Sequence, residues 1–317
     1  MRFSFTDDQR AFAAGLRDML GVHCTPAHVR ATWDSGQGHD AALWARLAEM
    51  GVLSMMVPEA AGGMGGSEVD AILLFEELGR ACAPGPVIET AAVGLPALAA
   101  AGWPAEGIVA YWAAREPYVA HAHVADGILT PDGWLTGNEL TEVHGIDGGR
   151  RLFEVAGGEN VRIDGFDAAL AFDRGALATA AYLVGLSEAM IAIAADYARQ
   201  REQFGKPIGS FQAVKHLLAD ALIKVEFAKA PTYRAAWSVA NNEPTASRDV
   251  SMAKAFANEA AYRTSRATMQ VHGGIGYTWE ADLQLYMKKA WALMRAWGDT
   301  SFHRRRVGAS VLTLGTE

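Results

Sequence analysis

Two short segments of this chain combine residue types that could bind a dinucleotide. One covers residues 201–212 (REQFGKPIGSFQ) and the other covers residues 270–277 (QVHGGIGY). Arg201 offers an always-charged fork of donors that suits a pyrophosphate. The amides of Gln212 and Gln270 can hydrogen-bond the edge of a ring or a ribose. Together these groups predict a site for a ligand with a diphosphate at its centre and polar groups on either side.

Glycines distinguish the second segment. Gly273, Gly274 and Gly276 have no side chain that would keep a ligand away from the backbone. A glycine-rich turn on its own is a weak signal. The alternative is that these glycines only break helices and that Arg201 is a surface charge. The residues alone leave both interpretations open.

Long helices joined by short connections must position both segments. Residues 176–198 are apolar nearly all round, which is typical of a helix buried inside a bundle. Apolar residues recur at helical spacing over 214–225, and Pro231 is expected to end or kink that helix. Further helices are expected over 245–270, 283–295 and 301–311. The two segments therefore lie at connections within a predicted C-terminal bundle.

The rest of the chain divides into a helical part and a strand-rich part. Helices are predicted after Thr6, which has Gln9 at capping-box spacing, and over 41–50 and 69–81. Short runs of β-forming residues then alternate with turn signals and predict about five strands. These runs are 108–111, 118–120, 134–136, 152–155 and 161–163. The pattern predicts a mainly α protein with a small β domain, divided into 1–107, 108–168 and 169–317.

Composition and charge exclude several classes of protein. The 317 residues are 50% hydrophobic and 20% charged, so the chain can bury a sizeable core. The net charge of -8 argues against binding nucleic acid, which depends on neutralising phosphates. Cys24 and Cys82 form neither a disulfide framework nor a zinc site, and a cytoplasmic location is the simplest expectation. No signal peptide is evident, and the uncharged stretches 90–104 and 175–187 are expected to be too short to span a membrane.

The chain resembles the acyl-CoA dehydrogenase family of flavoproteins over nearly its whole length. The resemblance rests on Pro58-Glu59 with the loop ending at Gly66, and on residues 76–80 (EELGR), 201–206, 270–277 and 298–301 (GDTS). It implies a helical N-terminal domain, a middle β-domain and a C-terminal four-helix bundle. It also implies FAD as cofactor, with removal of an α-proton from an acyl-CoA and hydride transfer from Cβ to flavin N5.

The departures from the family pattern concern the catalytic base and the flavin ring. Most relatives carry a Glu base in the late loop, where this chain has Gly298, and others carry it where this chain has Gly175. The middle domain is about half the expected length, and we find neither the Thr-Glu-Pro and Gly-Ser-Asp segment nor the Trp-Ile-Thr-Asn strand. Phe302 replaces the Gln that contacts the cofactor's adenosine end from its own subunit. The parts that act on a subunit's own flavin are therefore missing.

The parts that reach across a dimer interface to the neighbour's FAD are kept. By resemblance these are Arg201, Gln203, Phe204, Phe211, Gln212, Gln270, Val271, His272, Gly273 and Gly274. The resemblance thus implies a subunit that completes the FAD site of a full-length homologue, as in the α2β2 actinobacterial enzymes of steroid side-chain degradation. That partner supplies the base, the ring pocket and most of the acyl-CoA site, and an external acceptor takes the electrons. No catalytic residue is assigned to this chain.

Two alternatives remain at this stage. The first is a self-sufficient homo-oligomeric enzyme that uses Asp299, the one acid near the missing base, although its side chain is shorter and starts one residue away. The second is a scaffold subunit that binds no flavin.

Other residues carry weaker signals. His121 and His123 alternate on a possible strand, but no third metal ligand lies at suitable spacing, so a solvated strand edge is expected. Residues 304–306 (RRR) could meet a phosphate or form a solvated helix end. His272 is expected to space the backbone. Trp291 and Trp297 are expected to be core or interface aromatics.

Overall fold

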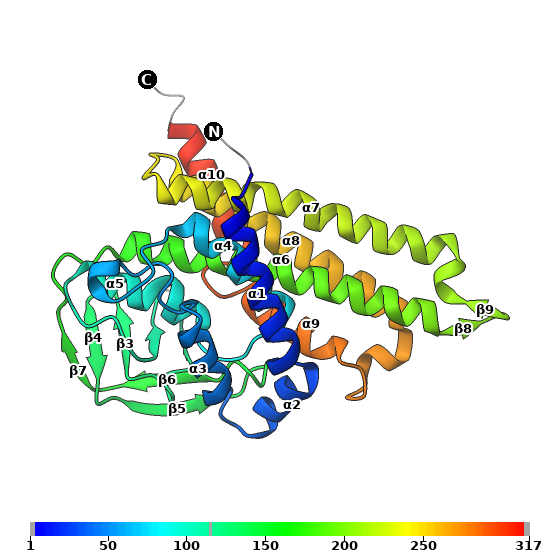
Figure 1. Cartoon of the computed structure of the whole chain (residues 1–317), viewed down its shortest axis with the longest axis horizontal. Coiled ribbons are helices and arrows are strands. Elements are labelled where there is room, and N and C mark those ends of the chain that lie inside the picture. The colour runs from blue at the N-terminus through cyan, green and yellow to red at the C-terminus, as the bar shows by residue number, and fades with distance from the viewer. Residues whose placement is uncertain (1–3, 114–115, 314–317) are drawn as a thin grey trace.

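Helices dominate the computed structural model, which describes residues 4–113 and 116–313 (Figure 1). The N-terminal helices begin where the sequence supplies caps. Thr6 Oγ1 accepts a hydrogen bond from Gln9 N, and Gln9 Oε1 accepts one from Thr6 N, which forms the predicted capping box. The helices of this part are α1 (Asp7–His23), α2 (Pro26–Asp34), α3 (Ala41–Glu49), η1 (Glu59–Ala61), α4 (Glu68–Arg80), the π-helical η2 (Ile88–Gly94) and α5 (Leu95–Ala100).

A small strand-rich part follows and forms two sheets. One has the order β1-β3-β4-β7 with β1 and β3 parallel, and the other has the antiparallel order β2-β6-β5. A small apolar core, which includes Val119, Ile128 and Phe153, packs within this part. The strands are β1 (Val109–Tyr111), β2 (Val119–Ala120), β3 (Gly127–Thr130), β4 (Gly133–Thr136), β5 (Glu139–Val143), β6 (Leu152–Ala156) and β7 (Glu159–Val161).

The expected number of strands is too low, because β3 and β5 were not predicted. β3 begins at a glycine, which is a poor strand former, and β5 is a largely exposed strand with acids at 139 and 142. Both strands exist because they pair with neighbours, β3 with β1 and β4, and β5 with β6. Pairing of this kind is set by tertiary structure rather than by the local sequence.

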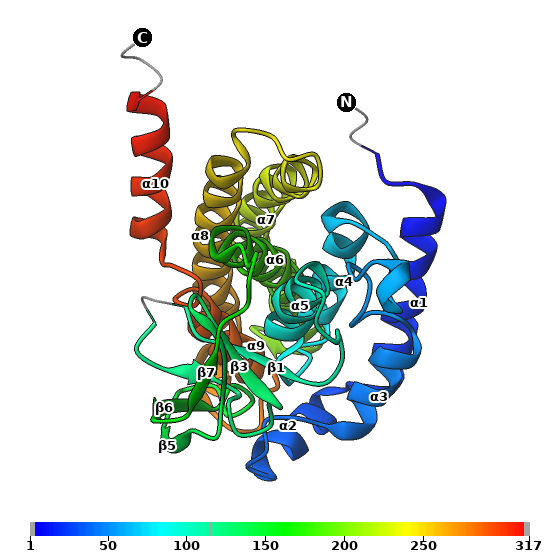
Figure 2. The ribbon, with the colours of Figure 1, turned by 90° about the vertical axis from the view of Figure 1, so that its left-hand side faces the viewer.

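The long helices α6 (Ala168–Gln200), α7 (Gln212–Ala240) and α8 (Ala246–His272) form the body of the C-terminal bundle and lie side by side in Figure 1. In Figure 2, α10 stands at one edge of the molecule and α1 at the other. Among its contacts, α10 packs on α8, and α9 packs on α6 and α8. The elements are α6 (Ala168–Gln200), β8 (Glu202–Gln203), β9 (Lys206–Pro207), η3 (Ile208–Ser210), α7 (Gln212–Ala240), α8 (Ala246–His272), η4 (Gly273–Tyr277), α9 (Leu283–Leu293) and α10 (Thr300–Thr313).

The helix α6 is longer than expected and covers Ala168–Gln200. By length and composition α6 could cross a membrane. The expectation that the stretch around 175–187 is too short to span a membrane is therefore wrong. However, 78% of its most apolar window is buried inside the protein. It packs against α4, α7, α8 and α9, as the core helix of a soluble protein does.

Pro231 was expected to end or kink its helix; α7 continues past it, so the first of these two alternatives is wrong. A proline inside a helix removes one backbone hydrogen bond and crowds the preceding turn. Here Ala228, Thr232 and Ala235 around it are buried, and α7 packs along α8 over much of its length. Tertiary packing offsets the local penalty.

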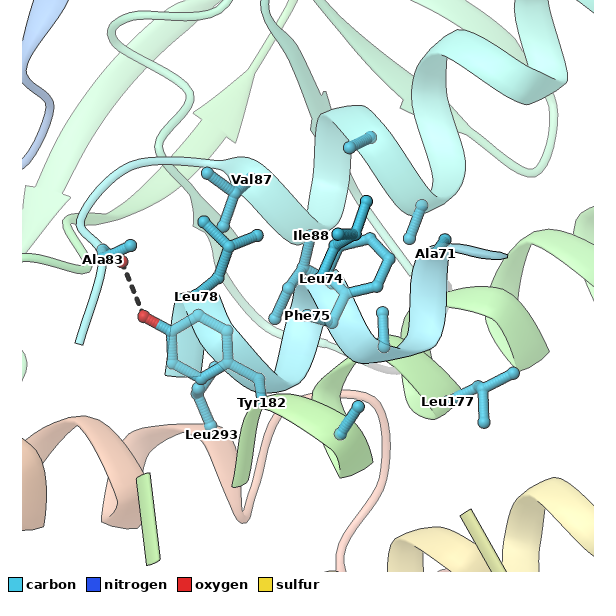
Figure 3. Close-up of a cluster of buried hydrophobic side chains, with 14 of the residues drawn as sticks. Ala71, Leu74, Phe75, Leu78, Ala83, Val87, Ile88, Leu177, Tyr182 and Leu293 are labelled. Carbon is cyan, nitrogen blue, oxygen red and sulfur yellow. Dashed lines mark hydrogen bonds between the residues drawn. The ribbon is translucent and has the colours of Figure 1, made fainter. Parts of the chain in front are cut away.

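The helices α4 and α6 cross at very close distance, which explains the glycine of the EELGR segment. A Cβ atom on Gly79 would overlap the backbone of Tyr182, and one on Gly185 would overlap the carbonyl oxygen of Glu76. Figure 3 shows the side chains around this crossing, where the Tyr182 hydroxyl donates to the carbonyl oxygen of Ala83 at 2.6 Å. The two glycines let the backbones touch, and this fixes the N-terminal helices against the bundle.

Candidate functional site

The structure brings the two sequence-predicted segments together at one end of the bundle. Val271, near the end of α8, packs in a cluster with Ala198 of α6, Ile208 of η3 and Val214 of α7. The rings of Tyr197 and His272 stack with their centroids 4.5 Å apart. The connection from α6 to α7 and the connection after α8 therefore form one continuous surface.

The β8–β9 hairpin gives this surface its projecting edge. Arg201 ends α6, and its carbonyl oxygen accepts a hydrogen bond from Ile208 N at 2.8 Å across the base of the hairpin. Phe204 and Gly205 form the turn with φ values of +54° and +75°, as a tight two-residue hairpin turn requires. The Phe204 side chain is 92% exposed and meets Phe211 edge-on at 6.2 Å. Lys206 Nζ lies 4.5 Å from the centre of the Phe211 ring.

Polar side chains on this surface are open to solvent. Arg201, Gln212 and Gln270 are all exposed. Within residues 4–113 and 116–313, no group hydrogen-bonds or ion-pairs with the Arg201 guanidinium, whose own backbone bonds are satisfied. Gln203 Nε2 donates to the neighbouring carbonyl oxygen of Glu202. These groups form a donor-rich face that a ligand from outside the subunit can reach.

The glycines after α8 leave the backbone accessible, while the two residues before them hold it in place. Gly273 has φ +63° at the end of the helix, and a Cβ on either Gly273 or Gly274 would meet no atom within 4 Å. The side chains of Val271 and His272 are buried. His272 Nδ1 lies 2.8 Å from the Thr268 carbonyl oxygen, and burial lowers the pKa of this histidine. The neutral ring thus supports the segment, in keeping with its expected spacing role.

The late loop between α9 and α10 (residues 294–299) forms a second, separate region. Aromatic side chains from this loop and from the start of α10 occupy the space beside both positions where relatives carry a base. A Cβ on Gly298 would overlap the ring of Phe302 and lie 3.0 Å from His303 Nε2, and the φ of +90° there disfavours any side chain. A Cβ on Gly175 would overlap the ring of Trp297. Aromatic rings therefore fill the space that a glutamate side chain would need.

Trp297 is clamped in this position on several sides. The backbone N–H of Trp297 donates to Glu116 Oε1 at 3.2 Å, and its carbonyl oxygen lies 2.8 Å from His303 Nε2. Burial lowers the pKa of His303 to about 3, so the neutral ring can donate through Nε2. The Trp297 ring stacks on Tyr111 with centroids 5.0 Å apart. A positive φ of +59° in a tryptophan is unusual and is maintained by these contacts.

Lys254 of α8 fixes the same loop from beneath, and the sequence analysis missed it. Its fully buried ammonium group donates to Asn258 Oδ1 at 2.8 Å and to the carbonyl oxygens of Leu293 and Gly298 at 3.1 and 3.3 Å. Burial lowers its pKa to about 7. The one available signal was its place beside Ala253, on the stripe of α8 that faces the core.

Asp299 caps a helix in this structure. Its Oδ1 accepts a hydrogen bond from Phe302 N at 2.8 Å, and its carbonyl oxygen accepts one from His303 N at 3.1 Å. These are the contacts of an N-cap residue at the start of α10.

The two regions lie at opposite ends of α6. Phe172 in the first turns of α6 contacts Trp297 and Phe302 of the late loop, whereas Arg201 directly follows the last residue of the helix. At a rise of 1.5 Å per residue, this separation is about 40 Å. Figure 1 shows the β8–β9 hairpin at the end of the molecule away from β3, β4 and β7. One chain therefore cannot bring both regions to the same dinucleotide.

The histidine pair differs from expectation. His121 and His123 lie in a turn after β2, His121 has φ +60° and only 2% of it is exposed, so the expected solvated strand edge is wrong. Burial lowers the pKa of His121 well below its ordinary value. The described part of the chain contains no cluster of three or more metal-ligating side chains.

The arginine run at the start of α10 is divided between two roles. Arg306 donates to Asp173 Oδ1 at 2.7 Å and to Ser247 Oγ at 3.0 Å, so it ties α10 to α6 and α8. Arg304 and Arg305 are exposed, as in a solvated helix end. Trp297 is a core residue, and Trp291 is half-buried with its Nε1 donating to Ser265 Oγ at 3.1 Å.

Comparison with known proteins gives consistent matches over the chain. Residues 6–105 match the family model "Acyl-CoA dehydrogenase, N-terminal domain", and residues 164–312 match "Acyl-CoA dehydrogenase, C-terminal domain". The chain is 35% identical over 305 residues to "Acyl-CoA dehydrogenase IpdE2" of Mycolicibacterium smegmatis, covering 92% of this chain and 95% of that protein. It is 32% identical over 301 residues to the protein of the same name from Mycobacterium tuberculosis, covering 90% and 91%.

Solved structures agree with the fold. A chain of the ChsE4-ChsE5 complex from Mycobacterium tuberculosis matches with a TM-score of 0.84 and 26% identity, covering 98% of this chain and 99% of that one. Butyryl-CoA dehydrogenase from Megasphaera elsdenii matches with a TM-score of 0.84 at 21% identity, covering 98% and 100%. The expected fold, mainly α with a small β part, is confirmed. This chain belongs to the acyl-CoA dehydrogenase family.

Proposed function

We propose that this chain is a subunit of a heteromeric FAD-dependent acyl-CoA dehydrogenase and is inactive alone. Its surface formed by residues 201–212 and 270–274 completes the FAD site of a longer homologue, which supplies the base and the pocket for the flavin ring. The observation that carries this proposal is the closure of Gly175 and Gly298 by aromatic rings. General-base catalysis is worth about 10²- to 10⁴-fold, so a chain without a base needs a partner that has one.

The residues present fit one end of a dinucleotide. Arg201 has a guanidinium with no partner in the described chain, which suits a diphosphate. Gln203, Gln212 and Gln270 offer amides, Phe204 and Phe211 offer aromatic rings, and Gly273 and Gly274 offer open backbone beside the buried Val271 and His272. When bound, FAD accepts the hydride that leaves the Cβ of the acyl group. This chain holds and orients the cofactor, and it moves no proton itself.

The comparisons favour a two-subunit assembly and a steroid-type substrate. One structural match is named as the ChsE4-ChsE5 complex, and another, "Tcur3481-Tcur3483 steroid ACAD G363A variant", is also named for a pair of proteins. By similarity we assign this chain to an α2β2 heterotetramer in the cytoplasm. The heterotetramer acts on a bulky acyl-CoA, such as the CoA thioester of a steroid side chain, and passes electrons to an external acceptor.

Expression of the chain alone and together with a full-length homologue tests the proposal. We expect the chain alone to be colourless or insoluble, and the co-purified pair to be yellow, with a flavin count and stoichiometry readable by native mass spectrometry. The longer homologue, expressed alone, is the control. Yellow and fully active protein from this chain by itself would refute the proposal.

The capping role of Asp299 leads to a prediction that separates the proposal from a self-sufficient enzyme. In Asp299→Asn, asparagine caps the helix about as well as aspartate, so folding is kept. We expect dye reduction by the co-purified pair with acyl-CoA to change by less than about tenfold, whereas loss of a general base costs about 10²- to 10⁴-fold. Loss of turnover with unchanged FAD content would show that Asp299 is the base.

A further inference from the structure

A large cavity lies beside the late loop, at the end of the molecule away from the proposed FAD surface. Its volume is about 620 Å³, which is within the range of small-molecule sites. Residues from the strand-rich part, the start of α6, α9 and α10 line it, and one side is open to solvent. Much of its wall is apolar or aromatic and includes Tyr118, Leu152, Phe172, Trp291 and Phe302.

The acidic side chains that line this cavity form contacts within the protein itself. Glu116 accepts a hydrogen bond from Trp297 N, and Asp299 caps α10. Asp147 forms a buried ion pair with Lys289 at 3.1 Å. Each of these acids therefore has a structural contact within the protein, and Asp147 is neutralised by a lysine.

Two arginines that line the same cavity have guanidinium groups without a partner in the described part of the chain. Arg295 follows α9, Arg305 lies in α10, and both line the cavity with exposed side chains. Neither guanidinium has a hydrogen-bond or ion-pair partner among residues 4–113 and 116–313. A third guanidinium, that of Arg150, reaches Glu89 through one terminal nitrogen at 3.6 Å, while its buried Nε has no partner in the same ranges. The cavity thus combines an apolar wall with guanidinium donors that lack acceptors.

We propose that this cavity is a second, non-catalytic binding site for an amphipathic anion, a small molecule with a rigid apolar body and a carboxylate or phosphate group. The apolar body packs against the aromatic wall, and Arg295 and Arg305 bind the anionic group. The site is non-catalytic because the positions of the missing base are filled by Trp297 and Phe302. This inference rests on the proposed function, because it requires that the flavin ring lies in the partner and leaves this cavity free.

Titration calorimetry on the co-purified pair tests the site with two probes. Sodium cholate carries a carboxylate on a rigid apolar body, and 1-naphthyl phosphate carries a phosphate on one. We expect one of them to bind, and we expect the double variant R295A/R305A to bind it at least about tenfold more weakly, because each lost charged hydrogen bond costs about 1.5–3 kcal/mol. The matched control is Arg304→Ala, an exposed arginine of α10 that does not line the cavity, and it should bind like the unmodified pair.

The outcomes separate this inference from the proposed function. Binding of cholate alone identifies a carboxylate ligand, and binding of 1-naphthyl phosphate alone identifies a phosphate ligand. If neither probe binds, or if R295A/R305A binds as well as R304A while FAD content is unchanged, this inference is refuted and the proposed function stands. If R295A/R305A loses FAD, the cavity holds the flavin ring and both are refuted.

Discussion

We expect the Arg201→Ala variant of the co-purified pair to lose bound FAD on gel filtration, while the two subunits stay together. The Arg201 guanidinium is exposed and has no partner in the described chain, so its removal leaves the fold of the subunit intact. A hydrogen bond to a charged group is worth about 1.5–3 kcal/mol, which corresponds to an affinity for FAD about 10- to 100-fold weaker. Flavin absorbance per complex and the FAD dissociation constant measure the effect.

Arg199→Ala is the matched control for this variant. Arg199 lies two residues earlier on α6, is exposed and, among the residues that the structure describes, pairs only with Asp196 on its own helix. We expect it to keep its FAD. If the Arg201 variant also keeps its FAD, this surface does not touch the diphosphate. The scaffold that binds no flavin would then be the better account of this chain.

Gly185→Ala is expected to have the largest effect on stability. The added methyl group would overlap the carbonyl oxygen of Glu76 and lie 2.7 Å from the backbone nitrogen of Arg80. These are backbone atoms of α4, so the two helices must move apart and disturb the packing shown in Figure 3. Overpacking usually costs about 1–3 kcal/mol, and we expect a loss at or above the top of that range. The urea midpoint of the co-purified pair, or the loss of soluble protein, measures it.

Gly15→Ala provides the opposite control. Gly15 is an exposed glycine inside α1, and a Cβ there would meet no atom within 4 Å. Alanine favours a helix over glycine by about 1 kcal/mol, so this variant should be slightly more stable than the parent. Equal urea midpoints for the two variants would show that α4 and α6 can separate without cost.

Local patterns in the sequence were sufficient to find α1, α3, α4 and the helices of the bundle, but α2, η2 and α5 were not predicted. The capping box at Thr6 and Gln9, and the apolar spacing of α6, α7 and α8, follow from rules that span only a few residues. The same rules failed at β3 and β5, and at Pro231 they allowed a helix end that the structure does not have. In each case contacts with elements distant in the sequence outweigh a local preference.

The sequence by itself determined the family, the absence of a glutamate at 175 and 298, and the donors offered by Arg201, Gln212 and Gln270. Only the tertiary structure decided what fills the space of the missing base, because Trp297 reaches Gly175 across more than a hundred residues of chain. It also decided that Lys254 holds the late loop, and that the proposed FAD surface and the cavity lie about 40 Å apart. The sequence specifies the type of each side chain, but the packing of the helices determines which side chains come into contact.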